Sequence, residues 1–310
     1  MRKIVVFKLG VLGIIAAIVL AGCKKDNTQE VLDQEMRLLQ QYLETNKITV
    51  EPTASGLYYI PITEGTGISP DLETWIEIHY IGELLDGTVF TTSFEKTAEM
   101  NDIYDEAFLY GPSRLQLGFI NLPGLNEGIG LMKVGGKAKF ILPSSLGMGR
   151  SSTGAVPPYS TLIYTIELLE AFDDPEKHEQ EKIWAYLKEG SFENVDSTDS
   201  GMYYIREVPG NEALFVDGDT VVVWYTGKFL DGRVFDSNIN GEAYSFTVPG
   251  SYLIDGWREG VKLMRDAEKG TFIIPYYLGY GPEGRYDNFG RVVIPPYMTL
   301  VFEMETKLEE

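Results

Sequence analysis

The sequence predicts an α+β protein that contains two copies of one domain, each an antiparallel sheet wrapped on one short helix. The segment SGLYYI at residues 55–60 recurs as SGMYYI at residues 200–205, and such self-similarity indicates a repeated structural unit. Apolar and polar side chains alternate through Ile76, Ile78 and Tyr80, which is typical of an antiparallel strand with one buried face. One short segment in each copy has helical spacing instead. Its apolar residues are Leu125, Ile129 and Met132 in the first copy and Trp257, Val261 and Met264 in the second.

The two copies differ mainly in their loops. They share one register through LDGTVF at residues 85–90 and LDGRVF at residues 230–235, but the first copy then carries an insert from Glu95 to Gly111. This insert mixes acidic residues with the apolar side chains of Met100, Ile103, Tyr104, Phe108 and Tyr110. We expect it to cover a sheet edge, and the alternative is that it binds a client chain. The second copy has its own longer loop, from Pro282 to Val293.

A helical segment precedes each copy. Apolar residues of the first segment, residues 31–47, fall on one helical face. In the second segment, residues 173–190, Asp174 and Pro175 have the pattern of an N-cap and first turn, and Gly190 can end the helix. We expect both helices to pack on their domains, with self-association as the alternative. The resulting boundaries are residues 48–172 for domain 1 and residues 191–310 for domain 2.

The first residues predict export and a lipid anchor. Basic residues precede an apolar run from Leu9 to Ala21, which is short for a membrane span but right for a secretory signal. The run ends in LAGC at residues 20–23, which resembles the lipobox of bacterial lipoproteins. We therefore expect a signal peptide at residues 1–22, a lipidated Cys23 and a tether over residues 23–30. This places the chain in the bacterial cell envelope, anchored by lipid to a membrane, for which we expect the outer membrane.

Charge and composition exclude several classes of partner and site. The 46 acidic against 26 basic side chains give a net charge of -20, which repels the phosphate backbone, so we expect no nucleic-acid partner. Cys23 is the only cysteine, and His79 and His178 are the only histidines. We therefore expect neither a metal site nor a cofactor.

An ordered series of short motifs in domain 2 resembles the FKBP-type peptidyl-prolyl isomerases. The series is WYTG at 224–227, DG at 231–232, FDS at 235–237, IDGW at 254–257, LGYG at 278–281, IPP at 294–296 and TLVF at 299–302. Each motif alone is common, because Asp-Gly turns and Pro-Pro pairs occur widely. Their order over nearly the whole domain makes the resemblance specific, and it extends over both copies.

The resemblance implies a hydrophobic cup in domain 2 that binds proline. The residues implied to contact substrate are Tyr225, Phe235, Tyr244, Leu253, Ile254 and Phe302. The implied catalytic residues are Asp236 and Tyr280 at the rim and Trp257 as the floor. The Ile254 amide and the Tyr280 hydroxyl are the implied donors to substrate carbonyls. A macrolide is a further ligand that the resemblance suggests for this cup.

Domain 1 departs from the pattern at three of these positions together. It keeps Tyr80 and Phe90, and Tyr164 takes the place of Phe302. The rim carboxylate, aromatic floor and rim hydroxyl are replaced by Thr91, Leu125 and Met148. We expect a degenerate pocket with weak or no isomerase activity.

The leading hypothesis is therefore an isomerase that rotates X-Pro bonds in unfolded or exported polypeptides, with domain 2 as the active domain. An alternative is a non-catalytic envelope chaperone or peptide-binding lipoprotein that uses its two FKBP-like domains to hold peptide segments of proline-containing or other client polypeptides. A third hypothesis makes the chain a structural part of a larger envelope assembly.

Overall fold

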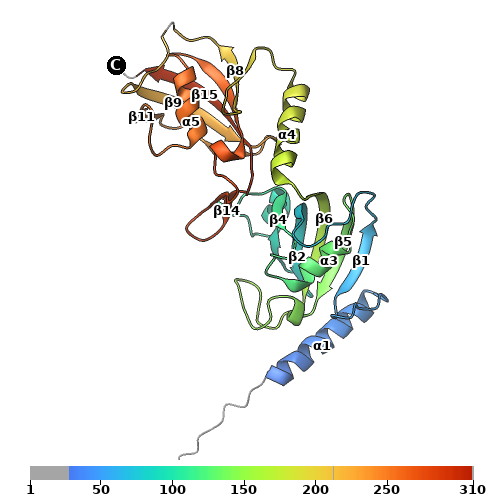
Figure 1. Cartoon of the computed structure of the whole chain (residues 1–310). Coiled ribbons are helices and arrows are strands. Elements are labelled where there is room, and N and C mark those ends of the chain that lie inside the picture. Colours follow the sequence, from blue (N-terminus) through green and yellow to red (C-terminus); the bar gives the residue numbers. More distant parts are fainter. Residues whose placement is uncertain (1–27, 212, 309–310) are drawn as a thin grey trace, which may run out of the picture.

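Two antiparallel sheets, each packed on a short helix, form the two halves of the protein (Figure 1). The computed structural model describes residues 28–211 and 213–308. The predicted fold class is confirmed. The expected signal peptide, Cys23 and most of the expected tether lie outside the described residues. Within residues 28–211 and 213–308, every helix is too short or too polar to cross a bilayer.

The sheet of domain 1 has six strands. Its order is β1 (Tyr58–Thr63), β5 (Lys137–Leu142), β6 (Leu162–Phe172), β2 (Trp75–Leu84) and β3 (Val89–Thr92), and β4 (Ser113–Gln116) also pairs with β2. The helix α3 (Pro123–Gly130) packs on its inner face, followed after β5 by the short turn η1 (Ser144–Leu146). The insert contains the helix α2 (Glu95–Met100). Proline at the first position of α3 suits a helix start, where its missing N–H would have no helical partner.

The sheet of domain 2 repeats this order and adds one edge strand. It runs β10 (Val234–Ser237), β9 (Thr220–Lys228), β15 (Leu300–Leu308), β12 (Lys269–Ile274), β8 (Tyr203–Val208) and β7 (Val195–Ser197), with β11 (Tyr244–Thr247) on β9. The helix α5 (Asp255–Gly260) continues into η2 (Val261–Leu263), and η3 (Tyr276–Leu278) follows β12. A separate hairpin is formed by β13 (Arg285–Tyr286) and β14 (Val292–Ile294). The shared register places Phe140 opposite Tyr164 in domain 1 and Phe272 opposite Phe302 in domain 2.

Each sheet is covered on both faces, which differs from the single buried face expected from alternation. Leu300, Val301 and Phe302 are consecutive in β15, and all three are buried. Val301 points to the outer face, where it packs with Ile183 of α4 (Pro175–Gly190). In domain 1, α1 (Thr28–Thr45) covers the outer face in the same way. The two preceding helices thus pack on their domains, and this burial explains why the central strands are apolar on both sides.

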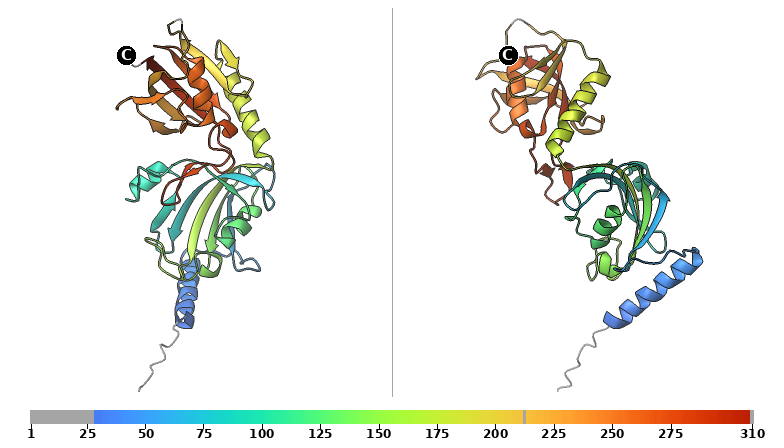
Figure 2. Two further views of the ribbon diagram at one scale, coloured as in Figure 1. Left: turned by 60° about the vertical axis from the view of Figure 1, so that its left-hand side comes forward. Right: turned by 45° about the vertical axis from the view of Figure 1, so that its right-hand side comes forward.

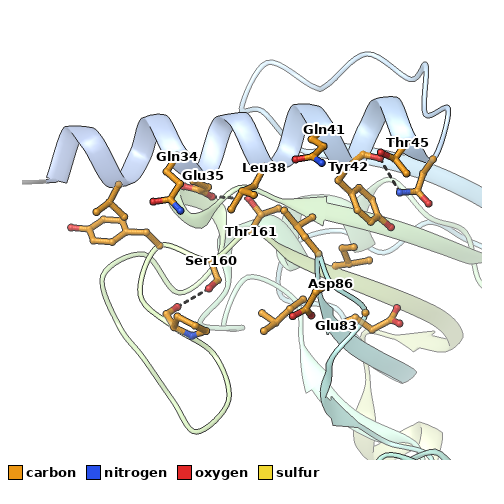
Figure 3. Close-up of a pocket in the computed structure, with 18 of the residues that line it drawn as sticks. Gln34, Glu35, Leu38, Gln41, Tyr42, Thr45, Glu83, Asp86, Ser160 and Thr161 are labelled. Carbon is orange, nitrogen blue, oxygen red and sulfur yellow. Dashed lines mark hydrogen bonds between the residues drawn. The ribbon is translucent and has the colours of Figure 1, made fainter.

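A buried glutamate holds each of these helices on its sheet. In α1, Glu35 accepts hydrogen bonds from the Thr161 hydroxyl at 2.8 Å and from the Ser144 hydroxyl at 2.6 Å. In α4, Glu179 accepts one from the Thr299 backbone N–H at 2.9 Å. Figure 3 shows Glu35 pointing from α1 toward Thr161, at one end of an open groove of about 850 Å³ beside the helix. Since a buried carboxylate needs such partners, these contacts determine where each helix sits.

The helix α4 also connects the two domains (Figure 2). It begins with Asp174, whose side chain accepts a hydrogen bond from the Lys177 N–H at 2.9 Å, and with Pro175. Arg114 of β4 lies 2.8 Å from Glu179 of α4 and 2.6 Å from Glu77 of β2. A buried arginine of domain 1 therefore bridges its own sheet and the helix of domain 2.

Candidate functional site

Five aromatic side chains of domain 2 converge between its sheet and α5. We call this set the aromatic cluster: Tyr225 of β9, Phe235 of β10, Tyr244 of β11, Trp257 of α5 and Phe302 of β15. Four sheet strands thus supply the walls, and the first turn of α5 supplies the residue between them. The shared sheet order positions them, because β11, β9 and β15 are consecutive neighbours.

Trp257 stands at the centre of the cluster. Its ring centroid lies 4.9 Å from Tyr225, 5.2 Å from Phe302 and 6.2 Å from Tyr244, with interplanar angles of 88°, 86° and 76°. Such edge-to-face pairs are the favoured geometry of aromatic rings. Trp257 and Phe302 are only 5% and 4% exposed, whereas Tyr225, Phe235 and Tyr244 are half-buried. The cluster therefore has a buried floor and partly exposed walls.

Three further predicted site residues border the cluster. Leu253, Ile254 and Tyr280 are half-buried and pack against the same core. Ile254 caps α5, and its carbonyl accepts hydrogen bonds from the N–H groups of Trp257 and Arg258, both at 3.1 Å. Its own N–H donates to no acceptor within the described part of the chain. This N–H therefore offers a donor on a half-buried residue that packs against the same core as the aromatic rings.

Asp236 meets the cluster through Tyr225. The Tyr225 hydroxyl donates a hydrogen bond to Asp236 Oδ2 at 2.8 Å. Burial, and then this contact with a carboxylate, raises the pKa of the Tyr225 phenol well above its ordinary value. Burial and the neighbouring Tyr252 raise the pKa of Tyr244 to about 12. Both phenols are neutral at physiological pH, so they offer hydrogen bonds and no proton-transfer chemistry.

Tyr280 borders the same core and follows η3 in the chain. Its hydroxyl accepts a hydrogen bond from Arg285 Nη1 at 3.3 Å, and the guanidinium lies 5.6 Å from the ring centroid. Arg285 belongs to the β13–β14 hairpin, so this pair ties the hairpin to the site. The structure thus brings all nine predicted site residues of domain 2 together.

The buried indole N–H of Trp257 is a second donor without an acceptor in the described residues. Polar groups left in this state usually receive a partner from water or a ligand. Among residues 28–211 and 213–308, no three histidine, cysteine or acidic side chains are grouped to hold a metal ion.

The corresponding region of domain 1 contains fewer aromatic side chains. Tyr164 lies 5.8 Å from Phe90 and 6.5 Å from Tyr80 by ring centroids, but the central position belongs to the buried Leu125. Met148 borders the same core, and its sulfur accepts a hydrogen bond from the Thr153 hydroxyl at 3.5 Å. Domain 1 therefore keeps three of the rings, Tyr80, Phe90 and Tyr164, whereas Ser113 stands where β11 has Tyr244. Thr91 and Leu125 take the places of the rim carboxylate and the indole floor.

Two residues that pack on the core of domain 2 were not foreseen from the sequence. Val293 of β14 and Leu109 of the domain 1 insert both pack against the core of domain 2. Val293 was part of the expected loop but had no assigned role. No sequence pattern pointed to Leu109, because its contact is between the two repeats and the motifs describe each repeat by itself.

Comparisons with known proteins identify relatives of both domains. The sequence model described as FKBP-type peptidyl-prolyl cis-trans isomerase matches residues 68–169 and 212–307. The mouse peptidyl-prolyl cis-trans isomerase FKBP9 is 27% identical over 232 residues, which cover 74% of this chain and 34% of that protein. The FKBP-type 22 kDa peptidyl-prolyl cis-trans isomerase of Escherichia coli is 42% identical over 122 residues, covering 39% of this chain and 56% of that protein.

A solved structure is also similar to part of the chain. The crystal structure of FkpA from Escherichia coli matches 46% of this chain and 62% of that chain, with 28% sequence identity and a TM-score of 0.38. The matched region spans about a third of the mouse relative and just over half of the 22 kDa bacterial relative.

Proposed function

Because the chain belongs to the FKBP-type peptidyl-prolyl cis-trans isomerase family, we propose that domain 2 catalyses rotation about X-Pro bonds in unfolded polypeptides. The single observation that carries this proposal is the aromatic cluster around Trp257, with Asp236 and Tyr280 on its rim. The proposed substrate-binding residues are the other six predicted ones. They are Tyr225, Phe235, Tyr244, Leu253, Ile254 and Phe302.

The reaction needs no nucleophile and no general base. Rotation breaks the resonance of the amide, with a barrier of about 18–20 kcal/mol, but it breaks no covalent bond. Catalysis therefore requires tighter binding of the twisted amide than of either planar form. A cup of aromatic rings accepts the proline ring and excludes water. The twisted amide has lost its dipolar resonance, so its desolvation costs less free energy than desolvation of the planar amide.

Two neutral donors near the cluster suit the carbonyl groups of such a substrate. The Ile254 N–H has no acceptor among the residues that the structure describes, and Ile254 is the N-cap of α5, three residues before Trp257. The Tyr280 hydroxyl accepts a hydrogen bond from Arg285, which holds its position. Hydrogen bonds from these two groups would orient the peptide on either side of the proline, because a preorganised donor costs little to align at the moment of rotation.

Exchanging the three distinguishing residues for those of domain 1 tests the proposal. The variant Asp236→Thr, Trp257→Leu, Tyr280→Met, in the full chain, should lower kcat/KM in a protease-coupled proline assay by about 100-fold, or about 2.7 kcal/mol. Thr91→Ala and Met148→Ala in domain 1 are the matched controls and should leave the rate unchanged. A wild-type chain that is folded by circular dichroism yet gives no rate enhancement would refute the proposal.

We further propose that the chain acts in the bacterial cell envelope, attached to the outer membrane by a lipidated Cys23, on exported proline-containing clients. The support is the sequence alone, since a short apolar run ends in LAGC. Replacing Cys23 by serine should move the protein from the membrane fraction to the soluble fraction and abolish labelling by a fatty-acid analogue. A macrolide is proposed as a competitive ligand of the aromatic cluster, measurable by quenching of tryptophan fluorescence.

A second candidate function, chaperone-like holding of clients, is favoured by domain 1. It keeps the fold and the rings of Tyr80, Phe90 and Tyr164 but replaces the floor by Leu125. If holding is separate from catalysis, the three-residue exchange variant should still suppress aggregation of an unfolded client as well as the wild type does. Loss of suppression together with the isomerase activity would argue against this second function.

A further inference from the structure

The insert of domain 1 reaches the hydrophobic core of domain 2, to which the aromatic cluster belongs. Leu109 is half-buried, and it packs against the same core as Tyr225, Phe235 and Tyr244. It is the one side chain of domain 1 in this core among the described residues. An apolar side chain from the degenerate domain therefore shares the apolar surface of the proposed catalytic domain.

The backbone next to Leu109 is held on the Phe235 side of the cluster. Arg233 Nη1 donates a hydrogen bond to the Tyr110 carbonyl at 3.2 Å, and its guanidinium lies 5.1 Å from the Phe229 ring. The Phe229 ring packs against Phe235 in a tilted pair, with 5.0 Å between the ring centroids. Gly111 permits this approach, because it has φ of 122° and a Cβ there would lie 2.3 Å from Arg233 Nη1.

The earlier part of the insert is held on the hairpin side. Asp105 Oδ2 lies 2.6 Å from Arg291 Nη1, and the same guanidinium pairs with Asp287 at 2.6 Å. Arg291 stands two residues before Val293, which packs against the core of domain 2. The left view of Figure 2 shows the insert with α2 extending from domain 1 beside this hairpin. The insert is thus attached to domain 2 on two sides of the site.

Further contacts between the two domains fix their relative position. Besides its two carboxylate partners, Arg114 Nη1 donates to the carbonyls of Pro296 and Tyr297, both at 3.3 Å. Trp75 packs edge-to-face on Tyr297 at 5.4 Å. These contacts are buried or half-buried, so they hold the insert at the site far better than exposed ion pairs alone would.

From these contacts we propose that the insert forms one wall of the substrate site of domain 2 and that Leu109 contacts the residue next to proline. This inference rests on the proposed isomerase function. Leu109 lines the site and does not seal it, because Tyr225, Phe235 and Tyr280 stay partly exposed and Asp236 is exposed. Domain 1 thereby selects polypeptides with an apolar side chain adjacent to proline.

The test compares tetrapeptides that differ only in the residue before proline, namely alanine, leucine, phenylalanine or glutamate, on the full chain. Leu109→Ala should lower kcat/KM about tenfold for the leucine and phenylalanine peptides, through a higher KM at constant kcat, and should change the alanine peptide little. Met100→Ala, in the same insert but with a side chain 79% exposed, is the matched control and should behave as the wild type.

A second variant tests the attachment of the insert without touching Leu109. Asp105→Asn removes the ion pair with Arg291. It should lower kcat/KM for the leucine and phenylalanine peptides as Leu109→Ala does, but by a smaller factor. Equal losses on all four peptides, no change, or a faster reaction with Leu109→Ala would each overturn the inference while leaving the isomerase assignment intact. A wild-type chain that isomerises none of the peptides would instead remove the proposed function, and this inference with it.

Discussion

The hydroxyl of Tyr225 donates a hydrogen bond to Asp236 Oδ2 at 2.8 Å, which joins the rim of the site to the wall of the aromatic cluster. In domain 1 the same two positions hold Tyr80 and Thr91, so a neutral hydroxyl replaces the carboxylate. The bond to a charged acceptor fixes the Tyr225 ring against Trp257 more firmly than a neutral acceptor would.

Asp236→Ala should therefore lower kcat/KM of the full chain about tenfold, because hydrogen bonds to charged groups contribute about 1.5–3 kcal/mol and part of this orients the cluster. Asp236→Asn keeps an acceptor without the charge, so its kcat/KM should lie between the values of the wild type and of Asp236→Ala. Both are measured in the proline assay. Thr91→Ala serves as the control, and an Asp236→Ala chain as active as the wild type would exclude a role for the carboxylate.

Gly227 and Gly82 occupy equivalent positions in β9 and β2 and offer a matched pair. A Cβ on Gly227 would lie 2.7 Å from Phe235 and 2.9 Å from Phe302, and one on Gly82 would lie 2.9 Å from Phe90 and 3.1 Å from Tyr164. Each alanine substitution should destabilise its own domain by about 1–3 kcal/mol through overpacking. Thermal unfolding measures this cost.

Only Gly227→Ala should also lower isomerase activity, because it displaces walls of the aromatic cluster. Gly82→Ala should retain full activity at a temperature where both variants are folded. Equal loss of activity in the two variants would mean that domain 1 also contributes catalysis.

The repeat and the motif series predicted the two sheets, their helices and the residues that meet at the site. They did so because register and periodicity are local properties of the chain. Contacts between the copies were not predictable in this way. Leu109 was not among the apolar insert residues singled out, and the pairing of Arg114 with Glu179 joins two residues that follow no common pattern. The covered outer face was also missed, since Val301 had no visible partner until α4 was placed on the sheet.

Among the residues that join the two domains, Arg114 should cause the largest loss of stability when it is replaced. Burial alone lowers the pKa of its guanidinium, but the carboxylates of Glu179 and Glu77 raise it above its ordinary value, so the group stays charged. Arg114→Met leaves the buried carboxylate of Glu179 without its cation, which should cost about 3–5 kcal/mol. Thermal unfolding of domain 2 and a larger radius of gyration in small-angle scattering report the loss.

Arg114→Met combined with Glu179→Gln should recover part of that cost, because no uncompensated buried charge remains. Lys137→Ala breaks the pair with Glu167, whose side chains are 39% and 32% exposed, and is expected to cost less than about 1 kcal/mol. If the double variant is no more stable than the single one, the penalty does not arise from the charge of Glu179.

The junction between β6 and α4 contains a carboxylate with a strongly shifted pKa. His178 Nε2 lies 3.0 Å from Glu170 Oε2, and the Lys182 ammonium contacts the other oxygen. These two partners, His178 first, outweigh burial and lower the pKa of Glu170 to about 2 from an ordinary value of 4.5. A depressed folded-state pKa means that the stabilisation is complete above about pH 4.5 and is lost as the pH falls toward 2.

Glu170→Gln should therefore reduce the free energy of unfolding at pH 7 by about 1 kcal/mol, a value kept low because about a third of the side chain is exposed and solvent screens the pair. The gap between variant and wild type should narrow steadily below pH 4.5 and close near pH 2, as measured by urea unfolding across this range. Glu181→Gln, on the exposed side of α4, should differ from the wild type by less than about 0.5 kcal/mol at every pH. A gap that stays constant from pH 7 to pH 2 would show that Glu170 acts through packing, because a lost methylene or amide contact does not titrate.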